Sequence, residues 1–189
     1  MNIYLKTALI PLAFTLLSSC SSAPKQMVVS PQVIGMTSNA YLQKTANVIV
    51  NDLRTNSHII AIHKEGDAIE LISANTLLDE TIKSTYINLL NKQSLSINNN
   101  SANIITLTIN QADIKVSQEL VKYKTKSLIT LTAKVTSGEK TLTKTYKNNG
   151  KSEGVFTADL AVLERNFNQQ LGKVLTQIVN DKEIQLFIN

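Results

Sequence analysis

The sequence predicts an α+β fold, a two-layer sandwich in which two amphipathic helices pack on one face of a mainly antiparallel sheet. Apolar residues occupy alternate positions of 105–109 and recur in this way through 121–135, as in strands with one buried and one exposed face. Two further segments, 78–93 and 158–180, carry apolar residues at helical spacing. One-sided strands joined by short hairpins form antiparallel sheets, and apolar helix faces cover them.

Three short β-rich segments open the folded part of the chain, at residues 48–54, 59–62 and 68–72. Polar residues typical of turns separate them, at 55–57 and 65–67. Because consecutive strands joined by short connections usually lie next to each other, we expect a three-stranded meander.

A helix of about four turns is predicted next. Thr76 and Asp79 have the spacing of a capping box at its start. The helix ends near Gln93, and the asparagine run at 98–100 indicates a turn. One helical face is apolar and consists of Leu78, Ile82, Tyr86, Leu89 and Leu90.

The second half of the chain predicts longer strands and a second helix. After the strands at 105–110 and 121–135, residues 137–139 turn the chain into another strand that ends at 148–150. The helix at 158–180 follows, and the apolar end of the chain, 184–188, is expected to pack as a short strand or turn. The apolar stripe of this helix is Leu160, Leu163, Phe167, Leu171, Val174, Leu175 and Ile178.

The N-terminus has the layout of a lipoprotein signal peptide. Lys6 precedes an apolar run at 8–17, which is shorter than the roughly 20 residues that a membrane-spanning helix needs. The next residues fit a lipobox, which consists of Leu17, Ser18, Ser19 and Cys20. We therefore expect residues 1–19 to be removed and Cys20 to carry a diacylglycerol thioether and an N-acyl chain such as palmitate, which together anchor the protein stably.

Cys20 is the only cysteine, so a lipidated mature chain has no disulfide, no thiolate metal site and no cysteine nucleophile. Residues 20–44 are polar and interrupted by prolines, which predicts a flexible tether that carries a short strand at 27–29. Residues 45–189 are then one periplasmic α+β domain. Because Ser21 replaces the aspartate that favours inner-membrane retention, we expect the inner leaflet of the outer membrane, with the domain facing the periplasm.

Positive charge is concentrated in the second half of the chain. Nine lysines and two acidic residues lie between positions 115 and 151. Lys122, Lys124 and Lys126 project from one face of a strand, where they are candidate contacts for an anionic ligand. The alternative is that these lysines protect a solvent-exposed sheet face or edge.

Several short motifs are spread over nearly the whole chain. They are the lipobox, Ser30-Pro31, Asn51-Asp52-Leu53-Arg54, Thr145-Tyr146-Lys147, Gly154-Val155-Phe156, and Ile184 with Phe187-Ile188. With these motifs the chain resembles the YajG family of bacterial lipoproteins. The resemblance implies a lipoprotein whose biochemical role is not established, with no catalytic residues to carry over.

Catalytic and metal-binding patterns are weak throughout the sequence. His58 and His63 are five residues apart on a strand-like segment, which places them on opposite faces. His63 lies near acidic residues at 65 and 67, which indicates a solvated turn more than a metal site or an acid/base cluster. Asp52 and Arg54 alternate onto one face of a strand and could form a functional pair, but a surface salt bridge between strands is the preferred interpretation, and such pairs contribute little to stability. We therefore predict no catalytic residue, no metal and no cofactor.

Three functions remain open at this point. The preferred one is a non-enzymatic accessory or scaffold protein that binds another envelope protein by a sheet edge or an exposed helix face. The alternative is a binding module for peptidoglycan fragments or lipopolysaccharide through the lysine-rich hairpin. A cell-wall hydrolase ranks third because no acid/base pair is evident. Nucleic acid is not an expected partner, since a lipidated periplasmic protein does not meet it.

Overall fold

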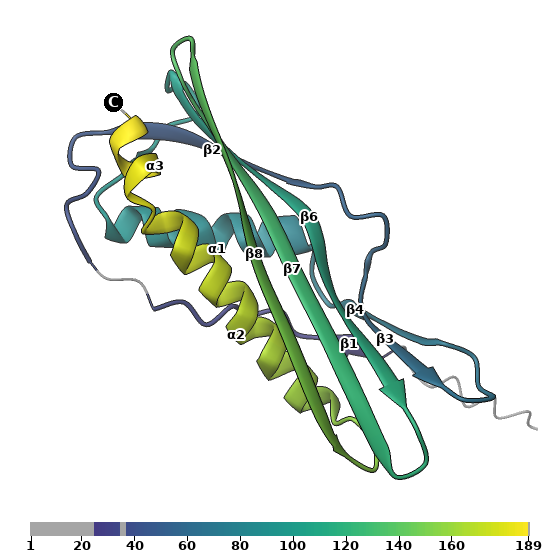
Figure 1. Cartoon of the computed structure of the whole chain (residues 1–189). Helices are drawn as coiled ribbons and strands as arrows, with labels where there is room; N and C mark the ends of the chain where they lie inside the picture. The colour runs from purple at the N-terminus through teal and green to yellow at the C-terminus, as the bar shows by residue number, and fades with distance from the viewer. Residues whose placement is uncertain (1–24, 35–36, 189) are drawn as a thin grey trace, which may run out of the picture.

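The structure is a computed structural model that describes residues 25–34 and 37–188, in which strands and helices mix as predicted (Figure 1). Eight strands form a curled sheet, and three helices accompany it in this part of the chain. The elements are β1 (Gln26–Met27), β2 (Thr45–Asp52), β3 (His58–Lys64), β4 (Glu70–Ala74), α1 (Leu78–Lys92), β5 (Ser96–Ile97), β6 (Asn103–Gln118), β7 (Lys122–Ser137), β8 (Lys140–Val155), α2 (Leu160–Val179) and α3 (Lys182–Phe187).

The antiparallel strands β6, β7 and β8 are 16 residues each and dominate the sheet. The alternation in the sequence is confirmed in β6 and β7, where every second residue is buried. Helices α1 and α2 contact each other, and α2 lies along β7 and β8 (Figure 1). Their apolar stripes and the buried rows of β6 and β7 make up the core.

The predicted meander at the start of the domain is wrong, because β2 and β3 do not pair with each other. Both run parallel to β6 and share one of its edges. Residues 47–52 of β2 pair with 104–109, and residues 60–64 of β3 pair with 114–118. A 16-residue strand is long enough to hold two shorter strands end to end. Only β3 and β4 form the expected antiparallel pair.

Two further local predictions are also corrected. Helix α1 begins one residue later than a capping box requires: Leu77 is the N-cap and gives no side-chain hydrogen bond. The Thr76 hydroxyl instead contacts the hydroxyl of Thr81 at 3.1 Å. The apolar end of the chain forms the short helix α3, because the Asp181 side chain accepts hydrogen bonds from the backbone N–H groups of Glu183 and Ile184.

Strand β8 continues past the predicted turn at 148–150 and ends only at Val155. Gly150 is directly opposite Ser127 of β7. A Cβ atom at this position would lie 2.7 Å from the Ser127 hydroxyl and 2.8 Å from the side-chain nitrogen of Gln170. The glycine therefore provides space for the helix α2 side chain and does not mark a turn.

The described part of the predicted flexible tether, 25–34 and 37–44, packs against the domain. Strand β1 pairs with β4, and the side chains of Met27 and Val29 are buried. The Asn168 amide of α2 holds this segment: its Oδ1 accepts from the Ser30 N–H at 2.9 Å and its Nδ2 donates to the Val28 carbonyl at 3.0 Å. In the described residues, packing against the domain thus extends back at least to Met27, well before the predicted boundary at residue 45.

Gly172 of α2 gives a test of this packing. A Cβ atom there would lie 2.1 Å from the carbonyl oxygen of Gln32. Gly172→Ala gains about 1 kcal/mol of helix propensity, but the overlap with backbone is expected to lower the free energy of unfolding by roughly 1–3 kcal/mol. Urea denaturation measures this change, with exposed Gln169→Ala as the control. A Gly172→Ala protein as stable as the control would show that the N-terminal segment is not packed here.

Candidate functional site

The three lysines singled out in the sequence lie on the solvent-exposed face of β7. Lys122, Lys124 and Lys126 alternate with side chains on the helix-facing side, of which Thr125 and Ser127 are buried. Lys122 makes an ion pair with Glu119 at 3.3 Å, and Lys124 is the cross-strand partner of Glu153. Acidic neighbours therefore accompany two of the three lysines.

Lys126 has a different environment, because its two cross-strand partners are also lysines. Lys115 of β6 lies opposite it on one side and Lys151 of β8 on the other. Neighbouring strands are about 4.8 Å apart, and like charges directly opposite each other are unfavourable. Within the described part of the chain, no ion pair is formed by Lys115, Lys126 or Lys151. We call these three residues the lysine row.

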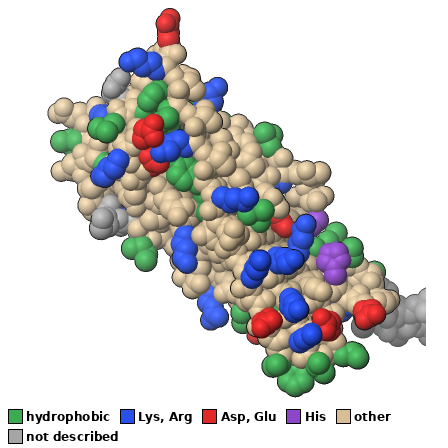
Figure 2. All heavy atoms as spheres, in the orientation of Figure 1, with side chains coloured by type: hydrophobic (Ala, Val, Ile, Leu, Met, Phe, Trp, Pro, Cys, Tyr) green, Lys and Arg blue, Asp and Glu red, His purple; other side chains and the backbone are tan. Residues whose placement is uncertain are grey.

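Sequence reasoning selected Lys126 but missed Lys115 and Lys151. The two residues lie on different strands, and only the register of β6, β7 and β8 places them beside Lys126. In the space-filling view, Lys and Arg side chains gather over the half of the sheet that contains the β6–β7 turn (Figure 2). This half is the most basic surface visible there.

The outer edge of β8 is the second feature of this region. In the described residues β8 pairs with β7 alone, so its other edge carries no strand along 16 residues. No residue of β8 is buried. Unpaired backbone N–H and C=O groups along such an edge are a template for another strand.

Helix α3 is attached to one end of β8 by a polar cluster around Asp181. The Asp181 carboxylate accepts a hydrogen bond from the Tyr146 hydroxyl at 2.7 Å and pairs with Lys144 at 2.6 Å. Burial raises the pKa of Asp181, but its hydrogen bonds with Lys144, Tyr146 and the backbone of α3 outweigh this effect. They lower the pKa to about 2. Lys144 also pairs with Glu183 at 2.9 Å. The charges of this cluster are thus compensated, unlike those of the lysine row.

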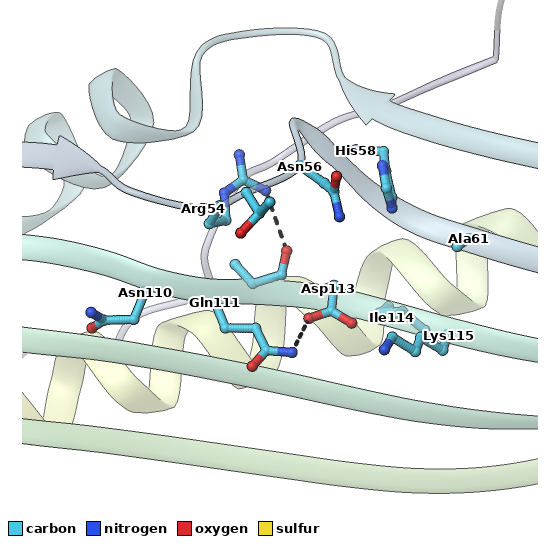
Figure 3. Close-up of a pocket in the computed structure, with 11 residues that line it drawn as sticks. Arg54, Asn56, His58, Ala61, Asn110, Gln111, Asp113, Ile114 and Lys115 are labelled. Atoms are coloured by element: carbon cyan, nitrogen blue, oxygen red, sulfur yellow. Dashed lines mark hydrogen bonds between the residues drawn. The ribbon is translucent and has the colours of Figure 1, made fainter.

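A polar cavity of about 300 Å³ lies where the edge of β6 passes from β2 to β3 (Figure 3). Arg54 lines it and binds Asp52 through Nε at 3.0 Å and through a terminal nitrogen at 2.7 Å. The same guanidinium donates to the carbonyl of Ala112 at 3.3 Å, and the Arg54 side chain is only 8% exposed. Although burial raises the pKa of Asp52, the Arg54 hydrogen bonds outweigh it and lower the pKa.

These contacts correct the expected role of Asp52 and Arg54. They are not a surface salt bridge between strands but neighbours at the end of β2. Their pair lies at the junction where β3 replaces β2 along β6, and Arg54 donates a hydrogen bond to a backbone carbonyl there. His58 lines the same cavity, whereas His63 is exposed near the other end of β3. The described residues contain no group of three His, Cys, Asp or Glu side chains placed to hold a metal.

The lipobox residues Leu17, Ser18, Ser19 and Cys20 lie outside the described part of the chain. Among the described helices, none is long and apolar enough to cross a membrane. A family model described as "Uncharacterized lipoprotein" matches residues 31–189. The chain belongs to this lipoprotein family. The YajG-type resemblance in the sequence is thereby confirmed.

A solved structure shares the fold of this lipoprotein family member at low sequence identity. It is a Xanthomonas campestris protein of the family DUF330, which aligns with a TM-score of 0.59 and 14% identity, over 84% of this chain and 95% of that one. Weaker likenesses are to a Helicobacter pylori protein named as a putative neuraminyllactose-binding hemagglutinin homologue (TM-score 0.41, 11% identity, 85% and 95% coverage) and to rare lipoprotein B of Shewanella oneidensis (TM-score 0.33, 9% identity, 67% and 92% coverage). No curated protein matches.

Repulsion within the lysine row predicts that the removal of one of its charges stabilises the folded protein. Lys126→Gln removes two like-charge contacts and is expected to raise the free energy of unfolding by about 0.2–1 kcal/mol at low salt. The gain should shrink at high salt, where such repulsion is screened. Lys134→Gln is the matched control, because Lys134 lies on the same face of β7 between Thr106 and Thr143. Equal effects of the two substitutions at low salt would show that the lysine row carries no repulsion.

Proposed function

We propose that this protein is a lipid-anchored accessory protein of the bacterial envelope that binds another envelope protein and has no catalytic activity. Membership of a lipoprotein family supports the anchor, and the lipobox assigns it to Cys20, with a diacylglycerol and an N-acyl chain. The absence of aspartate after Cys20 supports the inner leaflet of the outer membrane, with the domain in the periplasm.

The observation that carries the proposed binding is the free edge of β8. A 16-residue strand with one unpaired edge offers a partner a long series of backbone hydrogen bonds. Strand β7 supports it along its entire length, and α2 packs behind it. The pairing with β7 therefore holds β8 in strand conformation along its whole length.

Charge indicates what kind of strand fits this edge. Strand β8 contains four lysines and one acidic residue, Glu153, and only Lys144 has acidic partners among the described residues. A second copy of β8 would place lysines against lysines, which disfavours self-pairing. A strand with acidic side chains complements the edge, so we assign the occupant as an acidic segment of an envelope protein.

A second candidate function rests on the lysine row. Three uncompensated ammonium groups on neighbouring strands suit a phosphate or carboxylate group of lipopolysaccharide or peptidoglycan fragments. Lys122 and Lys124 extend this surface toward the β6–β7 turn. Strand pairing ranks first because, in the described residues, the outer edge of β8 is unpaired along all 16 residues. The lysine row offers a ligand only three side chains.

The proposed absence of catalysis is supported by the roles of the polar clusters. Arg54 and Asp52 bind each other and a backbone carbonyl, while Asp181 caps α3 and binds Tyr146. These groups thus bind partners within the fold. A cell-wall hydrolase would need an acid and a base directed at a substrate cleft.

The β8 edge is tested by site-specific photocrosslinking in intact cells. A photoreactive residue in place of Thr143 or Thr145 on β8 is expected to capture one envelope protein, identified by mass spectrometry. The same residue in place of the exposed Ser84 on α1 should capture none. Lys147→Glu with Lys151→Glu should reduce capture several-fold, because the partner strand is acidic, whereas Lys83→Glu with Lys92→Glu on α1 should not.

Two results would contradict this proposal. Equal capture from β8 and α1 would mean that the edge is not the binding surface. Capture of no protein, combined with sedimentation of the purified protein with isolated cell wall that is lost when Lys122, Lys124 and Lys126 become Gln, would establish the second candidate instead.

A further inference from the structure

One end of the long sheet carries an exposed apolar surface. The turn between β6 and β7 contributes Leu120, 98% exposed, and Val121, 65% exposed. The end of β8 adds Val155, 71% exposed, and Phe156, 68% exposed. We call these four residues the apolar tip. A contiguous apolar surface of this kind on a folded domain usually marks a place of contact.

The backbone holds the tip in place. The Glu119 N–H donates to the Lys122 carbonyl and the Phe156 N–H donates to the Val121 carbonyl, each at 2.9 Å, so the two segments are tied together. Phe156 has a φ of 62°, a left-handed conformation that is unfavourable for an aromatic residue. The fold thus accepts strain at a residue whose side chain is directed into solvent, which points to a role outside the domain.

Lysines surround the tip on the sheet side. Lys122 is the cross-strand partner of Val155, and Lys124 follows two residues further along the same face. Acidic residues also lie at this end: Glu119 and Glu153 face these two lysines, and Glu65 and Asp67 of the β3–β4 turn line one hollow with Leu120. Figure 2 shows apolar side chains at this end of the molecule, with basic and acidic side chains next to them and more basic side chains further along the sheet. Apolar side chains backed by lysines match the interface of a bilayer that contains anionic phospholipid.

The start of the described chain lies toward the same end. Strand β3 ends with Lys64 paired to Gln118, so the β3–β4 turn lies beside the β6–β7 turn (Figure 1). Lys25, just before β1, binds Glu70 at the start of β4 at 2.8 Å. Only four residues lie between Cys20 and Lys25, so these two residues are at most about 17 Å apart. A lipid on Cys20 therefore keeps the tip near the membrane surface.

We infer that the apolar tip inserts into the bilayer surface that carries the lipid anchor, with Lys122 and Lys124 against anionic phospholipid headgroups. This inference rests on the proposed lipidation of Cys20 for the orientation of the domain. The sheet then stands on its tip, and the β7–β8 turn at the other end points away from the membrane. The apolar side chains supply the insertion, and the lysines favour an anionic surface.

The test uses a fluorophore on the lipidated full-length protein in vesicles of phosphatidylethanolamine and phosphatidylglycerol. Lipidation blocks Cys20, so Leu120→Cys offers a single thiol for an environment-sensitive dye. Emission should shift to the blue, and phospholipids with brominated acyl chains should quench it. The matched control is Glu139→Cys in the β7–β8 turn, where neither change is expected.

A second measurement separates the tip from the anchor. Residues 20–189 with Cys20→Ser should sediment with the same vesicles and more weakly with phosphatidylcholine vesicles. Leu120→Asn with Phe156→Asn should weaken this sedimentation at least roughly ten-fold. Asparagine tolerates the left-handed backbone at 156, so the variant should fold. The control pair is Leu42→Asn with Leu186→Asn, two exposed leucines outside the tip.

The possible failures are distinguishable. If Cys20 takes up no fatty-acid label but the unlipidated chain still needs Leu120 and Phe156 for vesicle binding, the anchor is wrong and the tip is right. If the labelled tip of the lipidated protein stays unquenched, or both Asn pairs weaken binding equally, the inference is overturned. Capture of a protein through the tip in place of lipid contact would overturn it as well.

Discussion

The fold depends on the way the edges of β6 are used. Strand β7 occupies one edge completely, while β2 and β3 divide the other, end to end and both parallel to β6. At the junction, Arg54 binds both Asp52 and the Ala112 carbonyl. On the β7 side, the sheet in the described residues ends at β8, whose outer edge carries no strand.

The sequence predicted elements that depend on local periodicity and failed on those that depend on distant partners. The alternation of apolar and polar residues was sufficient to predict β6 and β7. The apolar stripes were sufficient to predict α1 and α2. The meander failed because a strand pattern does not state which strand it pairs with. Gly150 was interpreted as a turn because the Gln170 side chain that it accommodates is 20 residues away along the chain. The packed segment before β2 was missed because Asn168 and Gly172 hold it from the second half of the chain.

The candidate site was likewise predictable only in part. Exposure of Lys122, Lys124 and Lys126 followed from the alternation of β7, but the lysine row required the register across three strands. The free edge of β8 and the apolar tip were not predictable, since both depend on which strands and turns end up adjacent. Together they give a consistent geometry: a sheet that stands on the membrane by one end presents the β8 edge along its side, within reach of neighbouring envelope proteins.

The binding surface depends on the outer edge of β8 being open in the protein by itself. Amide hydrogen exchange followed by nuclear magnetic resonance measures this, since each backbone N–H of β8 points either toward β7 or away from it. We expect slow exchange throughout β7 and an alternation of slow and fast exchange along residues 140–155. Uniformly slow exchange along β8 would show that the edge is already covered and that no free edge is available to a partner.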